Sequence, residues 1–184
     1  MSLFDNSRNV GIAMWLVGIL NIVIGISLIV LVFVDDDRDT IGAISGVGQI
    51  IGGFIFFGFG QLVKRGNIAG KWNVLTQFIK TVGIVSVIEG IFNLASSVVS
   101  GAITIAIGLI LLFIYKKMTD GKVETLDKIN WIILMILFVI QLVVSIIAIL
   151  DFPIGTLIGI CNIIIYVFML ISLLDKETKN EMGM

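Results

Sequence analysis

Glu89 is the residue of this sequence best placed to do chemistry, because it is the one carboxylate in the middle of a long apolar run. It lies within TVGIVSVIEGIFNLASSVVS, residues 81–100. A charge at the centre of a bilayer costs about 2.5–3.5 kcal/mol on insertion scales, so such a residue points to a function. Two interpretations stay open. Glu89 is either a protonatable or cation-binding group inside a helix bundle, or a neutral carboxylic acid hydrogen-bonded to Asn21, Gln141 or a backbone carbonyl.

Amide side chains in other apolar runs complete the predicted site. Asn21 and Gln141 lie near the middle of their own runs, so both are predicted at the membrane depth of Glu89. Sites in membrane proteins built from repeats often lie at that depth, between the repeats. The candidate ligand- or ion-binding residues are Glu89, Asn21, Gln141, Asn162 and Asn93.

Other chemistry finds little support in the composition. The chain has no His, the commonest metal ligand and general base. Its single Cys161 lies inside an apolar run, without a partner for a disulfide or a metal, and is expected to fill core volume. Paired-carboxylate catalysis needs a second acid near Glu89, and every other acid falls in a loop, a tail or at a helix end. We expect no enzyme activity, no metal site and no cofactor.

Two further motifs have ordinary explanations. The aspartates of residues 35–39 resemble the start of a calcium-binding loop, but Thr40 and Gly46 stand where such a loop needs Gly and Glu. A solvated acidic turn is the favoured interpretation, with weak cation attraction as the alternative. The glycine-rich stretch 42–60 is not followed by Gly-Lys-Ser/Thr, so it is no phosphate loop. It favours close helix packing, and a flexible gating helix is the alternative.

The apolar runs that position these residues are long enough to cross a bilayer. Of the 184 residues 58% are hydrophobic, and the mean hydropathy is +1.15, well above a soluble domain. One crossing needs about twenty apolar residues. The sequence predicts an all-α, polytopic membrane protein whose six transmembrane helices span residues 10–34, 41–63, 74–97, 99–115, 131–150 and 154–174. Residues 116–130 are predicted as a polar connector.

Basic residues gather on one side of this topology. Because Lys and Arg favour cytoplasmic loops, residues 1–9 and the polar, frayed tail 175–184 are predicted to be cytoplasmic and the protein to lie in the cell membrane. Trp72 and Trp131 then fall at the cytoplasmic interface. The opposite side receives Arg38, and the cytoplasmic side receives Arg8, Lys64, Arg65, Lys71, Lys80, Lys116, Lys117, Lys122, Lys128, Lys176 and Lys179.

The six predicted helices form three pseudo-repeated hairpins, which together make up the predicted transmembrane domain 10–174. Each odd helix carries a polar residue followed four positions later by a small or polar one, and each even helix opens with Gly and has a small or amide residue seven positions on. The pairs are Asn21 with Gly25, Glu89 with Asn93, Gln141 with Ser145, Gly42 with Gln49, Gly101 with Gly108, and Gly155 with Asn162.

Glycines at helical spacing predict where helix backbones approach one another. The stripe of small residues on the first helix would also turn Asn21 inward. Such faces could equally join two copies of the chain, so a homo-oligomer is expected besides the lipid bilayer, and no basic patch suggests nucleic acid. The predicted packing glycines are Gly11, Gly18, Gly25, Gly42, Gly46, Gly53, Gly155 and Gly159.

A family resemblance adds to this interpretation. The hairpins WLVGILNIVIGISLIV…IGAISGVGQIIGGFIFFGF and VIQLVVSIIAILDFPIGTLIGICNIIIYVF resemble the repeats of HdeD-type acid-resistance membrane proteins. The likeness covers about residues 10–174, and Pro153 alone reproduces the proline of the external turn. The resemblance implies six helices and an association with acid or stress tolerance. It supplies no catalytic residues.

Two classes of function follow. The first is a small, non-catalytic membrane protein with a structural or stress-response role. The alternative is a small-solute or ion transporter, channel or substrate-binding membrane subunit, with a polar site at the midplane centred on Glu89.

Overall fold

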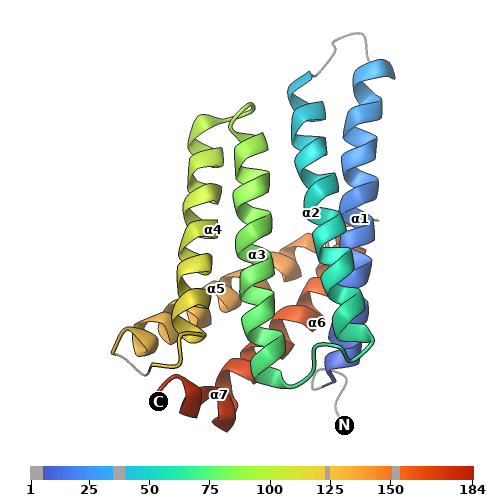
Figure 1. Ribbon diagram of the computed structural model, residues 1–184. Helices are drawn as coiled ribbons and strands as arrows, with labels where there is room; N and C mark the ends of the chain where they lie inside the picture. The colour runs from blue at the N-terminus through green and yellow to red at the C-terminus, as the bar shows by residue number, and fades with distance from the viewer. Residues whose placement is uncertain (1–5, 35–39, 123–124, 151–153) are drawn as a thin grey trace.

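A computed structural model describes residues 6–34, 40–122, 125–150 and 154–184, and the regular structure within these ranges is helical (Figure 1). In this part of the chain six helices are long and apolar enough to cross a membrane, which makes the chain a multi-pass membrane protein. The helices are α1 (Ser7–Val34), α2 (Thr40–Lys64), α3 (Lys71–Asn93), α4 (Val98–Met118), α5 (Thr125–Ala148), α6 (Ile154–Leu174) and the short α7 (Lys176–Glu181).

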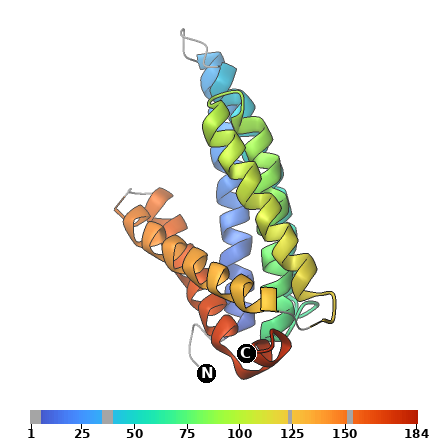
Figure 2. The ribbon, with the colours of Figure 1, turned by 90° about the vertical axis from the view of Figure 1, so that its left-hand side faces the viewer.

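The six long helices pair into three antiparallel hairpins, α1/α2, α3/α4 and α5/α6. The first two hairpins stand side by side in one layer, with α2 packed against α3. The third hairpin crosses behind this layer at a steep angle, and it leans away from α1–α4 as it rises (Figures 1 and 2). It packs through α6 against α1 and α3, while α5 packs chiefly against α6.

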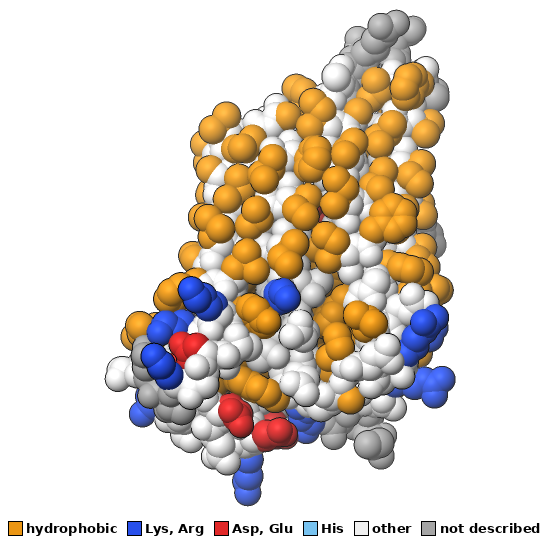
Figure 3. Space-filling model, in the orientation of Figure 1, with side chains coloured by type: hydrophobic (Ala, Val, Ile, Leu, Met, Phe, Trp, Pro, Cys, Tyr) orange, Lys and Arg blue, Asp and Glu red, His pale blue; other side chains and the backbone are white. Residues whose placement is uncertain are grey.

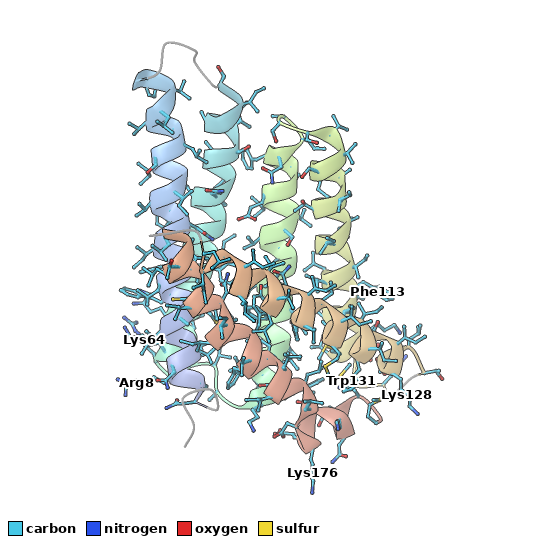
Figure 4. All side chains as sticks on the ribbon, turned by 180° about the vertical axis from the view of Figure 1, so that it is seen from behind. Arg8, Lys64, Phe113, Lys128, Trp131 and Lys176 are labelled. Atoms are coloured by element: carbon cyan, nitrogen blue, oxygen red, sulfur yellow. The ribbon has the colours of Figure 1, made fainter. Side chains whose placement is uncertain are left out.

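The first turn of α1 and the short C-terminal helix α7 lie at the same end of the molecule, called here the terminal end (Figure 1). Lys, Arg, Asp and Glu side chains gather there on the face shown in Figure 3, and hydrophobic side chains cover the rest of that face. Figure 4 places Arg8, Lys64, Lys128 and Lys176 toward the same end from behind. This separation of charged and apolar surface is the one expected of a chain that crosses a bilayer.

The buried core lies in the half of the molecule nearest the terminal end. Its side chains come from the N-terminal halves of α1 and α3, the middle of α5, the C-terminal parts of α2, α4 and α6, and Met182 after α7. Phe78, Phe168 and Met169 are at most 2% exposed. Farther from the terminal end the third hairpin diverges from the layer α1–α4, so fewer side chains of the third hairpin contact the first two hairpins there.

Glycines bring the helices of the first two hairpins into backbone contact. A Cβ added to Gly18 would lie 2.4 Å from the backbone nitrogen of Phe57, and one added to Gly53 would lie 2.7 Å from the backbone oxygen of Gly18. The glycines recur every seven residues on both helices, so each faces its partner once per two turns. The facing pairs are Gly11 with Gly60, Gly18 with Gly53, Gly25 with Gly46, Gly83 with Gly108, and Gly90 with Gly101.

In the described part of the third hairpin, one such contact is present. A Cβ on Gly159 would lie 2.6 Å from the backbone oxygen of Ser145. One heptad nearer the terminal end, Phe138 and Tyr166 hold the two helices apart, with ring centroids 6.2 Å from each other. Six of the predicted packing glycines therefore lie at helix contacts. Gly42 and Gly155 lie in the first turns of α2 and α6, and their predicted packing role stays a prediction.

The glycine contacts also correct the predicted repeat register. Gly25, Gly90 and Ser145 occupy equivalent places in the three hairpins, each at the outer close contact. The residues four positions earlier are Asn21, Ser86 and Gln141. Ser86, and not Glu89, is thus the counterpart of the two amides, and the carboxylate of Glu89 is an addition to the repeated pattern.

The predicted spans agree with α1, α2, α4 and α6 to within three residues. Two boundaries were wrong. The helix α3 ends at Asn93 because a turn follows, and Ser97 then caps α4 by accepting a hydrogen bond from the Ser100 amide at 3.3 Å. The helix α5 begins at Thr125, inside the predicted connector, because its polar first turns are packed and bury Asp127.

The C-terminal tail is not frayed, contrary to the prediction. Asp175 caps α7 by accepting from the Glu177 amide, and it also pairs with Lys71 of α3 at 2.9 Å. Thr178 and Met182 are almost fully buried. The predicted external turns 35–39 and 151–153, with Arg38 and Pro153, lie outside the described residues.

Candidate functional site

A cavity of about 240 Å³ lies where the third hairpin diverges from the first two, and it is partly open. It is large enough for several water molecules. Side chains from α1, α2, α3, α5 and α6 line it, so every hairpin contributes. Its polar lining residues are Asn21, Ser86, Glu89, Gln141, Asn162 and Tyr166.

Each polar residue reaches the cavity from the middle part of its helix. Asn21 lies halfway along α1, and Ser86 and Glu89 lie on one side of α3, three residues apart. Gln141 comes from α5 and Asn162 from α6. Gln141 is exposed and the others are half-buried, as expected for groups around a partly open space. Of the third hairpin, α6 packs against α1 and α3, and the hairpin leans away from them as it rises (Figure 2).

The carboxyl group of Glu89 lies against the backbone of α2. A Cβ added to Gly52 would lie 2.7 Å from Oε1 of Glu89 and 3.0 Å from a methyl carbon of Val85. The missing side chain at Gly52 therefore provides the space that the carboxyl group occupies. One turn away, Gly48 receives Phe92 of α3 in the same way.

The polar groups share the cavity without bonding to one another. Within the part of the chain that the structure describes, no hydrogen bond or ion pair joins Glu89 to Asn21, Gln141 or any other side chain. The geometry therefore does not show the hydrogen bonds from Glu89 to Asn21 and Gln141 that the second interpretation predicted. The groups face a common space in which a ligand or water would complete their hydrogen bonds.

Among the described residues, no basic side chain lines the cavity. Lys80, on the same helix as Glu89, has its ammonium nitrogen over the ring of Tyr115 in α4, 5.4 Å from the centroid. Lys64 lies over Trp15 in the same manner, at 4.8 Å. Both cations are thus held at rings outside the cavity, and the acidic group that a ligand would meet there is the carboxyl group of Glu89.

Aromatic rings close the cavity on the side of the terminal end. Phe78 is in contact with Phe56, Phe138 and Tyr166, at centroid distances of 6.3, 6.2 and 6.1 Å. Edge-on and tilted rings at these distances attract one another. We call these four residues the aromatic floor. The remaining lining residues are aliphatic, namely Val17, Val82, Val85, Ile158 and Ile165.

A smaller cavity of about 80 Å³ lies beside the first, toward α4. The two spaces share Phe78, Val82, Ser86, Gln141 and Tyr166 as lining residues. The remaining walls of the smaller cavity are apolar residues of α3, α4 and α5. The two form neighbouring parts of one region between the third hairpin and the layer.

The structure brings together four of the five predicted site residues. Asn21, Glu89, Gln141 and Asn162 all line the larger cavity. Asn93 does not, because it is the last residue of α3, where its backbone oxygen accepts a hydrogen bond from Ser96 Oγ. The prediction for Asn93 assumed that the helix continued beyond it.

Sequence reasoning did not include Ser86 or the aromatic members of the site among the candidate binding residues. Ser86 was detectable, since it shares a helical face with Glu89. Phe78 lies two turns before Ser86 on that same face, which is a weak signal that it belongs to the site. The signal is weak because an apolar residue in an apolar run carries little information. Tyr166 follows Asn162 by four residues and shares its predicted inward helical face, so the sequence did place it there. For Phe56 no sequence signal separates it from ordinary packing residues.

No cluster of three or more Cys, Asp and Glu side chains that could hold a metal ion occurs among the described residues. Compared with known proteins, the chain matches no protein-family model, no curated protein and no solved structure.

Proposed function

We propose that this protein binds a small polar or cationic solute in the cavity between its hairpins and carries it across the membrane. The observation that supports this most is the convergence of six polar side chains, from all three hairpins, on one cavity of about 240 Å³. Polar groups inside a membrane are costly, and those that face a cavity mark solute or ion pathways.

The charge of the lining narrows the solute class. Among the described residues that line the cavity, Glu89 is the acid, and none is Lys or Arg. An anion would meet the carboxyl group without a compensating cation, so an anionic solute is disfavoured. A cation, or a neutral solute with hydrogen-bond donors, is suited to one carboxyl and three amide groups.

The third hairpin is the element that would move. The two hairpins of the layer α1–α4 are each held by glycine contacts at backbone distance, whereas α5 packs chiefly against α6 alone. Transporters commonly alternate between two open states by rocking one bundle against another around a fixed site. Here the aromatic floor closes the cavity toward the terminal end, so the hairpin would have to shift to open that side.

Cysteine accessibility tests whether solutes enter the cavity. Ser86→Cys, made in a Cys161→Ala background and reconstituted in liposomes, is expected to react with a small charged methanethiosulfonate reagent. Ala106→Cys, on the outer face of α4, is the control and is expected to be protected by lipid. Equal protection of both thiols would indicate a dry cavity, and would favour the non-catalytic structural or stress-response role suggested by the resemblance.

Ion flux in the same liposomes tests the role of Glu89. We expect proton or cation flux in the native protein, loss of that flux in Glu89→Gln, and retention in Glu181→Gln, which changes an exposed acid outside the spans. Absence of flux from all three, with Ser86→Cys still reactive, would eliminate ion transport and leave a neutral or organic solute.

A further inference from the structure

The cavity has two chemically different ends. The lining stripe of α3 runs from Phe78 through Val82, Val85 and Ser86 to Glu89. Eleven residues separate its first and last members, about 16 Å along the helix axis. With a volume of about 240 Å³, a space lined over that length is longer than it is wide. One end holds the carboxyl group and the other ends on the aromatic floor.

The acidic end is suited to an ammonium group. The Glu89 carboxyl has the α2 backbone at Gly52 on one side, so a ligand would approach it from the cavity. The amide oxygens of Asn21 and Asn162 line the same cavity and can accept additional N–H bonds. Hydrogen bonds between a charged donor and a carboxylate are about twice as strong as neutral ones, more so away from water.

The aromatic end is suited to an apolar group and carries no second acid. Phe56, Phe78 and Ile165 line it, and the hydroxyl group of Tyr166 is its polar handle. None of the lining residues at this end can neutralise a second charge. A molecule that fills the whole cavity should therefore carry its positive charge at one end only.

We propose that the solute is a small monocationic amphiphile, an organic ammonium whose charged nitrogen lies at Glu89 and whose hydrocarbon part extends to the aromatic floor. This inference rests on the proposed function, because it names the class of solute that the same cavity takes. It distinguishes such amines from inorganic cations, which would leave the aromatic end empty, and from diamines, whose second charge would lie against Phe78.

The test uses the Ser86→Cys variant in the Cys161→Ala background, because residue 86 lies between the two ends. Reconstituted protein is treated with neutral methyl methanethiosulfonate, and the modification rate is measured with increasing hexylammonium. Each of four matched competitors changes one property of hexylammonium. 1-Hexanol lacks the charge, hexanoate reverses its sign, 1,6-diaminohexane carries a second positive charge, and potassium ion lacks the hydrocarbon part. The same series is run with Glu89→Gln added, and with Glu181→Gln as the control variant.

We expect hexylammonium to protect the thiol at lower concentration than any competitor. Glu89→Gln should weaken protection by hexylammonium at least about tenfold, the effect of losing one charged hydrogen bond, and should leave protection by 1-hexanol unchanged. Glu181→Gln should behave like the parent.

Three results would overturn the inference, and they separate its failure from that of the proposed function. Equal protection by hexylammonium and 1-hexanol, or protection unaffected by Glu89→Gln, would reject the ammonium while the reactive thiol still supported a solute cavity. If the thiol at residue 86 does not react, with either Glu89 or Gln at position 89, no accessible cavity exists there. Both the proposed function and this inference would then be rejected.

Discussion

At the scale of single residues, the missing side chain of Gly52 decides where the carboxyl group of Glu89 lies. The added Cβ would come within 2.7 Å of Oε1, at the flexible end of the Glu89 side chain. Such a clash is relieved by rotating that side chain, so the fold survives and the carboxyl group moves. Gly52 thus acts on the cavity by positioning Glu89, without lining the cavity itself.

Gly52→Ala is therefore expected to weaken hexylammonium protection of Ser86→Cys severalfold while the protein keeps its melting temperature within a few degrees. The matched control is Gly58→Ala, since an added Cβ there meets nothing within 4 Å. Ala is about 1 kcal/mol better than Gly in a helix, so the control should be neutral or stabilising. Equal ligand affinity in the two variants would show that Gly52 does not position the carboxyl group.

The site residues differed in how visible they were to sequence reasoning. Asn21, Glu89 and Gln141 were recognisable because a polar side chain in an apolar run is conspicuous. Their meeting at one cavity was not, because periodicity places a residue on a helix face and leaves open which helix that face meets. Asn93 failed for a simpler reason, since its helix ends there, and helix ends are the least certain part of a sequence-based prediction.

At the scale of the helices, the glycine contacts of the α1/α2 hairpin hold two backbones closer than any side chain allows. Gly18→Ala is predicted to destabilise the protein by about 1–3 kcal/mol, as overpacking does. The added Cβ would lie 2.4 Å from a backbone nitrogen, which cannot rotate away. Thermal unfolding in detergent measures this, again with Gly58→Ala as the control. An unchanged melting temperature in Gly18→Ala would contradict the backbone contact.

The short helix α7 is attached through Asp175, whose hydrogen bond from Lys71 holds the pKa of this carboxyl below its ordinary value of 3.8. A lowered pKa means that the ion pair stabilises the docked helix above pH 3.8, and that this stabilisation is lost as the pH falls through the lower, folded value. The attachment should thus persist into moderately acidic conditions.

Asp175→Asn isolates that ion pair, because Asn still caps a helix. We expect the docked state of α7 to lose less than about 1 kcal/mol at neutral pH, as partly exposed pairs do. Proteolysis at the C-terminus, or amide exchange in α7, measures the change, and the difference from the native protein should vanish at low pH. Glu177→Gln, at an exposed position, serves as the control. A difference that stays constant with pH would exclude the carboxylate as its cause.

The helices themselves were largely predictable, since long apolar runs admit little else in a bilayer. The span of α6 matches its prediction in full, because polar residues flank it on both sides. The helix α5 began earlier than expected because Asp127 and Asn130 look like loop residues, yet both are buried. The crossing of α5 and α6 behind the layer was not predictable, because apolar periodicity gives the face of a helix and not the angle at which it meets another.

At the scale of the whole molecule, the basic residues at the terminal end make orientation the simplest property to measure. Positive charge favours the cytoplasmic side, so both termini should be cytoplasmic. In a Cys161→Ala background, Asn67→Cys lies on the α2–α3 connection and Ala95→Cys on the α3–α4 turn, both exposed. A membrane-impermeant maleimide added to intact cells should label the second and not the first. The opposite labelling would invert the topology.

The lean of the third hairpin has a consequence for the lipids around it. The helix α5 has 24 residues, about 36 Å in length, but its oblique course lets it reach less of the height that α1–α4 span (Figure 2). A bilayer fitted to α1–α4 is too thick for α5 and α6, and mismatch of this kind is relieved by thinning the bilayer or by changing the tilt. A thicker membrane would bring the axes of α5 and α6 closer to the bilayer normal. The space between the third hairpin and the layer α1–α4, which holds the cavity, would then become narrower. The length of the acyl chains in the surrounding lipid would then determine how widely the cavity opens.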